Sequence, residues 1–118
     1  MRIAICDDNE IQIDIFMHRI NNFLKRNGDI KALITPYDKG QPLIDDVADG
    51  EWYDIVVLDI VLKEENGIEV AKELRVNGYD GNIIFCFQSY SGTYRQKHSY
   101  DKRKRLYSSG GISKYRIY

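Results

Sequence analysis

Three acidic residues of this 118-residue sequence stand at positions where carboxylates can act together. Asp7 and Asp8 directly follow the apolar end of Arg2–Cys6, and Asp59 directly follows the apolar run Ile55–Leu58. Mg²⁺ prefers oxygen ligands and often takes one or two carboxylates together with phosphate oxygens. A carboxylate can also attack a phosphoryl group and form an acyl phosphate. The three acids therefore predict a magnesium site with phosphoryl-transfer chemistry.

Asp59 is the better candidate for the nucleophile, because it stands alone at the tip of the most apolar run. Asp7 and Asp8 are adjacent, so they cannot both point equally well at one phosphorus atom. Taken alone, the acidic pair is more typical of a solvated turn or a helix N-cap, and Asp59 alone is no more specific. Their shared position at the ends of apolar runs favours the functional interpretation.

The elements that must position these acids follow from hydrophobic periodicity. Arg2–Cys6 predicts a strand, and Asn9 is a suitable N-cap for a helix that should end near Asn27 and Gly28. Further along the chain, the pattern predicts strands over Ile30–Thr35 (ending before Pro36), Tyr53–Leu58 and Asn82–Phe87, and helices over about Gln41–Ala48 and 67–76.

Residues 1–87 therefore read β-α-β-α-β-α-β, which predicts an α/β fold with a parallel sheet and helices on both faces. In the flavodoxin-like strand order, 2-1-3-4 with a fifth strand after it, the first and third strands are neighbours. Their carboxyl ends then lie side by side, where ligands bind in open α/β sheets. This order would bring Asp7, Asp8 and Asp59 to one edge.

Residues 88–118 do not continue the pattern. Residues 1–87 contain 9 basic and 17 acidic residues, whereas residues 88–118 contain 8 basic residues and one acid, Asp101. The last 31 residues hold six Tyr and six Ser but few aliphatic residues to bury at helix or strand spacing. We expect an atypical basic tail, disordered except for a weak edge strand over Ile112–Tyr118.

The bulk composition excludes several classes of protein. Hydrophobic residues make up 43% and charged residues 30%, as in water-soluble globular domains. No apolar run approaches the roughly 20 residues of a membrane-spanning helix, and no export signal is evident, so we expect a cytoplasmic protein. Cys6 and Cys86 lie in apolar runs and are expected to be buried free thiols, and His18 and His98 have no metal-ligand spacing.

At this point the chain resembles a response-regulator receiver domain (CheY-like), over about residues 1–87. The resemblance is carried by IAICDDN (3–9), YDIVVLDIVLKEENGIEVAKELR (53–75) and GNIIFCF (81–87), with Asn66-Gly67 at the family's spacing from Asp59. The amino-acid sequence of the second segment most resembles that of receivers that precede LytTR-type DNA-binding domains. On this basis residues 1–118 would form a single receiver domain with an atypical C-terminal part.

The resemblance implies specific roles. Asp59 would be the phosphoacceptor in a two-component system, phosphorylated by a sensor histidine kinase. Mg²⁺ would be held by Asp8 directly, by Asp7 through water, by Asp59 and by the backbone carbonyl of Val61. Any catalysis would be the domain's own phosphoryl transfer to Asp59 and the later hydrolysis.

Three departures accompany the resemblance. Lys63 stands where the family usually has a proline. Phe87 falls where the family has the Ser or Thr of its switch, and Ser89 would serve only if the strand end slipped by two residues. The family's Lys at the end of a fifth strand has no assigned counterpart among Lys97, Lys102, Lys104 and Lys114.

Alternatives follow from these departures. The chain could be a non-phosphorylated pseudo-receiver or interaction module, or a truncated or frame-shifted remnant without signalling output. Contact with DNA would come through an effector domain absent from this sequence or, less favoured, through the basic tail around residues 95–105. An exposed sheet edge would favour a homodimer.

Overall fold

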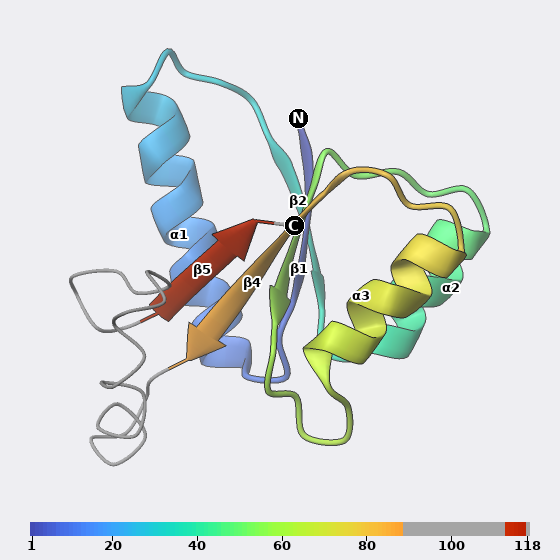
Figure 1. The fold of residues 1–118 in the computed structure, drawn as a ribbon. Coiled ribbons are helices and arrows are strands. Elements are labelled where there is room, and N and C mark those ends of the chain that lie inside the picture. Colours follow the sequence, from blue (N-terminus) through green and yellow to red (C-terminus); the bar gives the residue numbers. More distant parts are fainter. Residues whose placement is uncertain (89–112, 118) are drawn as a thin grey trace.

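The computed structural model describes residues 1–88 and 113–117 and contains one five-stranded sheet with the order β2-β1-β3-β4-β5 (Figure 1). The strands from β1 to β4 are parallel and β5 is antiparallel to β4. The expected order 2-1-3-4 of parallel strands is therefore confirmed, whereas the fifth strand departs from the expected parallel sheet in its direction. The elements are β1 (Arg2–Cys6), α1 (Glu10–Arg26), β2 (Leu33–Tyr37), α2 (Gly40–Ala48), β3 (Ile55–Asp59), α3 (Gly67–Val76), β4 (Asn82–Gln88) and β5 (Ser113–Ile117).

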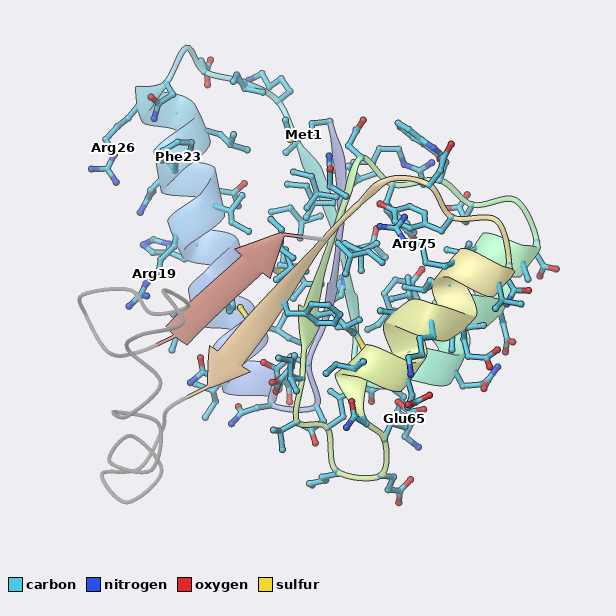
Figure 2. All side chains as sticks on the ribbon, viewed as in Figure 1. Met1, Arg19, Phe23, Arg26, Glu65 and Arg75 are labelled. Carbon is cyan, nitrogen blue, oxygen red and sulfur yellow. The ribbon has the colours of Figure 1, made fainter. Side chains whose placement is uncertain are left out.

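Helices cover both faces of the sheet, with α1 on one side and α2 and α3 on the other (Figure 1). The larger group of buried side chains lies between the sheet and the α2–α3 layer and includes Leu43, Leu58 and Leu74, which are fully buried. A smaller group lies beneath α1 and includes Ile5 and Ile13. On the far side of α1, Arg19 and Arg26 project away from the sheet (Figure 2). The strands are thus held rigidly between two layers, as a site at their ends requires.

Asparagine caps begin the two helices that flank the acidic residues. The Asn9 side chain accepts hydrogen bonds from the N–H groups of Ile11 and Gln12, as its position in the sequence predicts. The Asn66 side chain accepts from the Ile68 N–H at the start of α3. Each cap turns the chain from a strand end into a helix, so the residues between strand and cap stay at the edge of the sheet.

The second strand differs from the expected one. The predicted strand Ile30–Thr35 was wrong at both ends, because β2 spans Leu33–Tyr37 and includes Pro36. The Ile30 N–H returns to the Leu24 carbonyl at the end of α1, which keeps Ile30 out of the sheet. Pro36 is tolerated because β2 is an edge strand that pairs with β1 alone.

The third strand is shifted relative to Tyr53–Leu58 and ends on Asp59 itself. Tyr53 lies outside the strand yet is 1% exposed, and its hydroxyl pairs with that of Tyr37. Its burial thus comes from a side-chain network at the α2 face rather than from strand pairing. Because Asp59 is the last strand residue, its backbone is fixed by the sheet.

Beyond β4, the structure describes only β5, which confirms the edge strand expected within Ile112–Tyr118. Residues 89–112 and 118, which include Ser89 and the basic cluster of the tail, lie outside the described residues. Cys6 and Cys86 are buried and free, as expected. No helix in the described part of the chain has the length and apolar content needed to span a membrane.

Candidate functional site

The three acids meet at the carboxyl edge of the parallel strands. Asp7 and Asp8 follow β1, Asp59 ends β3, and the two strands are paired with Cys6 opposite Leu58. One carboxylate oxygen from each acid lies within 4.8 Å of the other two. The strand order thus brings together side chains that are more than 50 residues apart in the sequence.

Two of the three carboxyl groups are almost completely buried: Asp7 is 2% exposed and Asp59 is 3% exposed, whereas Asp8 is partly exposed. Burial, and then the charge of Asp7, raises the pKa of Asp59 to about 8. Burial also raises the pKa of Asp7, to about 6. The ionised site is therefore electrostatically unfavourable without a cation.

Backbone N–H groups orient each carboxylate. Asp7 Oδ1 accepts a hydrogen bond from the Asn9 N–H at 2.8 Å, and Asp59 Oδ1 accepts one from the Val61 N–H at 3.1 Å. Asp8 Oδ2 accepts one from the Lys63 N–H at 2.6 Å. Since these donors belong to the two loops that leave β1 and β3, the loops fix the directions of the acids.

The loop between β3 and α3, residues 60–66, is closed at its base. The Gly67 N–H donates to the Ile60 carbonyl at 2.8 Å, and Val61 pairs with Asn66 as an isolated bridge. A Cβ atom on Gly67 would lie 2.1 Å from the Asp59 carbonyl oxygen, so only glycine allows this approach. The Asn66-Gly67 pair therefore returns the chain tightly behind Asp59.

The donor set fits a hard divalent cation. It consists of carboxylate oxygens, without Cys or His, and two of the acids are buried with raised pKa values. The family resemblance implies the backbone carbonyl of Val61 as a further ligand, and Val61 lies beside the site, where its N–H donates to Asp59 Oδ1. These groups could hold a cation that relieves the repulsion among the carboxylates.

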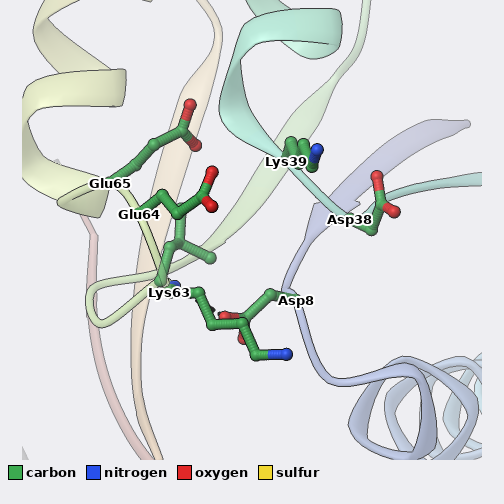
Figure 3. A pocket seen from close by; sticks show the side chains of 7 residues that line it. Asp8, Asp38, Lys39, Lys63, Glu64 and Glu65 are labelled. Carbon is green, nitrogen blue, oxygen red and sulfur yellow. Dashed lines mark hydrogen bonds between the residues drawn. The ribbon is translucent and has the colours of Figure 1, made fainter.

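Beside the cluster lies a cavity of about 170 Å³, on the side of Asp8 (Figure 3). The residues that line it are Asp8, Asp38, Lys39, Leu62, Lys63, Glu64 and Glu65. Sequence reasoning missed the Lys63 N–H, because a backbone donor carries no residue-type signal. It also missed Glu65, whose partner is 25 residues away.

The positions expected to carry the family's switch are described in part. Phe87 lies in β4, one residue beyond Cys86, which pairs with Asp59. Ser89, Lys97, Lys102 and Lys104 lie outside the described residues. Lys114 lies in β5 with its Cα opposite that of Phe87.

Comparison with known families decides the identity of the fold. The sequence model of the response regulator receiver domain matches residues 3–99. The chain belongs to the response regulator receiver domain family. In this receiver domain, the acids to which the family resemblance assigns roles, Asp7, Asp8 and Asp59, are therefore the same acids that the sheet brings together.

Solved structures are similar to this receiver domain in fold. The N-terminal domain of a response regulator/sensory box/GGDEF 3-domain protein from Carboxydothermus hydrogenoformans aligns with a TM-score of 0.60 and 21% identity, over 77% of this chain and 67% of that one. A Burkholderia pseudomallei response regulator, solved with a phosphorylated aspartic acid, a calcium ion and citrate, aligns with a TM-score of 0.54 and 17% identity, over 85% of this chain.

A Francisella response regulator receiver domain aligns with a TM-score of 0.54 and 19% identity, over 81% of this chain and 73% of that one. The receiver domain spans 54% of the Burkholderia chain. It thus corresponds to about half to three quarters of these solved chains. The comparison with curated proteins gives no match.

Proposed function

We propose that this receiver domain accepts a phosphoryl group on Asp59 from a histidine kinase, with Mg²⁺ held by Asp7, Asp8, Asp59 and the backbone carbonyl of Val61. The observation that carries the proposal is the convergence of three carboxylates within 4.8 Å at the end of the sheet. Burial of Asp7 and Asp59 makes this cluster costly to ionise, so a cation is the simplest physical reason for its arrangement.

The chemistry assigned to the chain is nucleophilic attack by a carboxylate oxygen of Asp59 on phosphorus. A new O–P bond forms, the P–N bond of the donor phosphohistidine breaks, and the leaving imidazole takes up a proton. Bound Mg²⁺ would neutralise negative charge on the transferring group. The Val61 N–H, which donates to Asp59 Oδ1, would hold the carboxylate in one rotamer for the attack.

The solved relatives support the choice of Asp59 and of a divalent cation. The Burkholderia response regulator contains a phosphorylated aspartic acid together with a calcium ion. The corresponding chemistry needs an aspartate at a strand end with further acids beside it. In this receiver domain Asp59 ends β3 and has Asp7 and Asp8 beside it. The kinase partner and a cytoplasmic location are inferred from membership of the family.

The test is incubation of the protein with acetyl phosphate and Mg²⁺, followed by mass spectrometry of the intact chain. We expect a gain of one phosphoryl mass that disappears in Asp59→Asn and when EDTA replaces Mg²⁺. The matched control is Asp14→Asn, since Asp14 is an exposed acid of α1 that does not belong to the carboxylate cluster. A folded wild-type protein that gains no phosphoryl group, or an Asp59→Asn variant that still gains one, would contradict the proposal.

A second candidate function is that of a pseudo-receiver. Such a domain would bind a second copy of itself or another protein without being phosphorylated. Phe87 favours it, because this residue occupies the β4 position at which the resemblance leads us to expect a hydroxyl. The two candidates differ in the mass measurement above. Folded protein with Mg²⁺ affinity but no phosphoryl gain would favour the pseudo-receiver.

A further inference from the structure

Helix α2 begins without a cap of its own. The N-cap residue is Lys39, whose side chain makes no capping hydrogen bond, and the first turn of α2 contains no acidic residue. The first N–H groups of a helix have no partner within the helix and are usually bound by an oxygen of the preceding residue. A lysine ammonium cannot accept such a bond, so α2 needs an acceptor from elsewhere.

Glu65 supplies that acceptor from the β3–α3 loop. Its Oε2 accepts a hydrogen bond from the Gly40 N–H at 2.6 Å, and the carboxylate lies at the end of the helix that carries partial positive charge. A Cβ on Gly40 would lie 2.7 Å from Glu65 Oε2 and 2.5 Å from a methyl carbon of Val70. The absence of a side chain at Gly40 thus lets the loop and α3 approach α2 this closely.

The same loop also holds a carboxylate of the candidate site. Lys63, two residues before Glu65, donates its N–H to Asp8 Oδ2 at 2.6 Å. Glu65 and Lys63 line the same cavity, with Glu65 near α2 and Lys63 beside Asp8 (Figures 2 and 3). Since residues 60–66 are closed at their base by the Gly67–Ile60 hydrogen bond, a second attachment at Glu65 limits movement of the loop as a whole.

We propose that Glu65 is a positioning residue for the cation site: by binding the Gly40 N–H, it holds the β3–α3 loop so that the Lys63 N–H orients Asp8. This inference rests on the proposed function, because the site that it serves is the proposed Mg²⁺ site. Residues that orient metal ligands through hydrogen bonds affect metal affinity without touching the metal. Glu65 would act through Lys63 and Asp8 in this way.

Two simpler roles would give Glu65 the same contacts. It could stabilise α2 and nothing more, or its negative charge could attract any nearby cation. Glu64→Ala tests the role of charge alone, since Glu64 is an exposed acid in the same loop and lines the same cavity. Glu64→Ala and Glu65→Ala each remove one negative charge close to the site, but only Glu65→Ala removes the contact with Gly40.

The experiment compares wild type, Glu65→Ala, Glu65→Gln and Glu64→Ala, each shown to be folded by circular dichroism. The dissociation constant for Mg²⁺ is measured by calorimetric titration. Hydrogen exchange of the Lys63 amide is measured by NMR in EDTA, so that the loop is also examined without metal. Glutamine keeps an oxygen acceptor of similar reach and is the conservative variant.

We expect Glu65→Ala to weaken Mg²⁺ binding about tenfold and to speed exchange of the Lys63 amide about tenfold. Glu64→Ala and Glu65→Gln should stay within about threefold of wild type in both measurements. Equal Mg²⁺ affinities for Glu65→Ala and Glu64→Ala, or unchanged Lys63 exchange in Glu65→Ala, would overturn the inference. A wild-type protein that binds no Mg²⁺ rejects the proposed function itself, and the Lys63 exchange then decides whether Glu65 holds the loop.

A substitution that gives α2 an N-cap of its own can show whether Glu65 acts by stabilising the helix or by positioning the loop. Lys39 has the extended backbone of an N-cap residue, so Lys39→Ser can supply a hydroxyl acceptor to the first turn. Added to Glu65→Ala, it should recover thermal stability but leave Mg²⁺ binding about tenfold weak, with Lys39→Ser alone as the control for the lost lysine charge. Full recovery of Mg²⁺ affinity in the double variant would show that Glu65 acts on α2 alone and would refute the positioning role.

Discussion

The interior of the sheet and its acidic edge are equally buried but differ in what burial does. Leu58 is 0% exposed and Asp59, the next residue of β3, is 3% exposed. Removing the leucine side chain from water contributes to stability. Removing the carboxylate from water opposes folding unless a proton or a cation accompanies it. One strand therefore carries a stabilising residue and a destabilising one side by side.

This difference shows how the fold supports its site. Leu58 lies in the large α2–α3 core with fully buried leucines from both helices, so β3 is fixed along its length. That rigidity holds Asp59 close to Asp7 despite their mutual repulsion. A looser strand end would let the carboxylates separate into water. The core thus supplies the free energy that keeps an unfavourable site together.

The largest effect that tests the comparison comes from the interior. Leu58→Ala should lower the free energy of unfolding by about 3–5 kcal/mol, because it removes a fully buried side chain and leaves a cavity. The measurement is urea unfolding followed by circular dichroism. Leu33→Ala is the matched control, since Leu33 is 61% exposed on the edge strand β2, and we expect it to cost less than about 1 kcal/mol.

The next effect comes from the acidic edge and has the opposite direction. The pKa of Asp59 in the folded protein is raised from 3.8 to about 8, so folding favours its protonated form. Its contribution to stability is therefore present below about pH 4 and is lost as the pH rises to about 8. Asp7, whose pKa is raised to about 6, acts in the same direction.

Asp59→Asn isolates this contribution, because asparagine is neutral at every pH and has nearly the same size and shape as aspartic acid. In EDTA, the variant and the wild type should differ little near pH 4, and the variant should be more stable by roughly 3 kcal/mol near pH 8.5, at about 1.4 kcal/mol for each pKa unit discounted for coupling. Urea unfolding at constant ionic strength measures the difference. A stability difference that does not grow with pH would show that the edge is not under electrostatic strain.

The sequence predicted the interior better than it predicted the edge. The alternation of strands and helices predicted a parallel sheet, and with the flavodoxin-like strand order the three acids were expected to meet at one edge, as they do. The backbone donor at Lys63 and the contact from Glu65 to Gly40 could not be predicted, because they depend on loop conformation rather than on residue type. Pro36 misled for a related reason: whether proline fits a strand depends on which neighbours that strand has.

The smallest of the three effects joins the two regions through the cation. A ligand that binds only the folded protein stabilises it by about 2.7 kcal/mol at a hundred times its dissociation constant. We expect Mg²⁺ to raise the free energy of unfolding by this order in wild type, and more near pH 8 than near pH 6, because the carboxyl groups must lose their protons to bind it. Thermal unfolding with MgCl₂ or with NaCl of equal ionic strength measures the gain.

Asp59→Asn should lose most of the Mg²⁺ effect. Leu58→Ala, where it still folds, should keep a larger part of it, since that substitution removes no carboxylate and only loosens the strand that holds Asp59. Stabilisation by Mg²⁺ that is equal at both pH values, or that survives in Asp59→Asn, would mean that the cation binds elsewhere on the acidic surface. The pH-dependent loss of stability that is measured in EDTA would then have a cause other than the lack of a bound cation. Loss of the effect in Asp59→Asn alone would instead tie the cost of burying this carboxylate to the ion that relieves it.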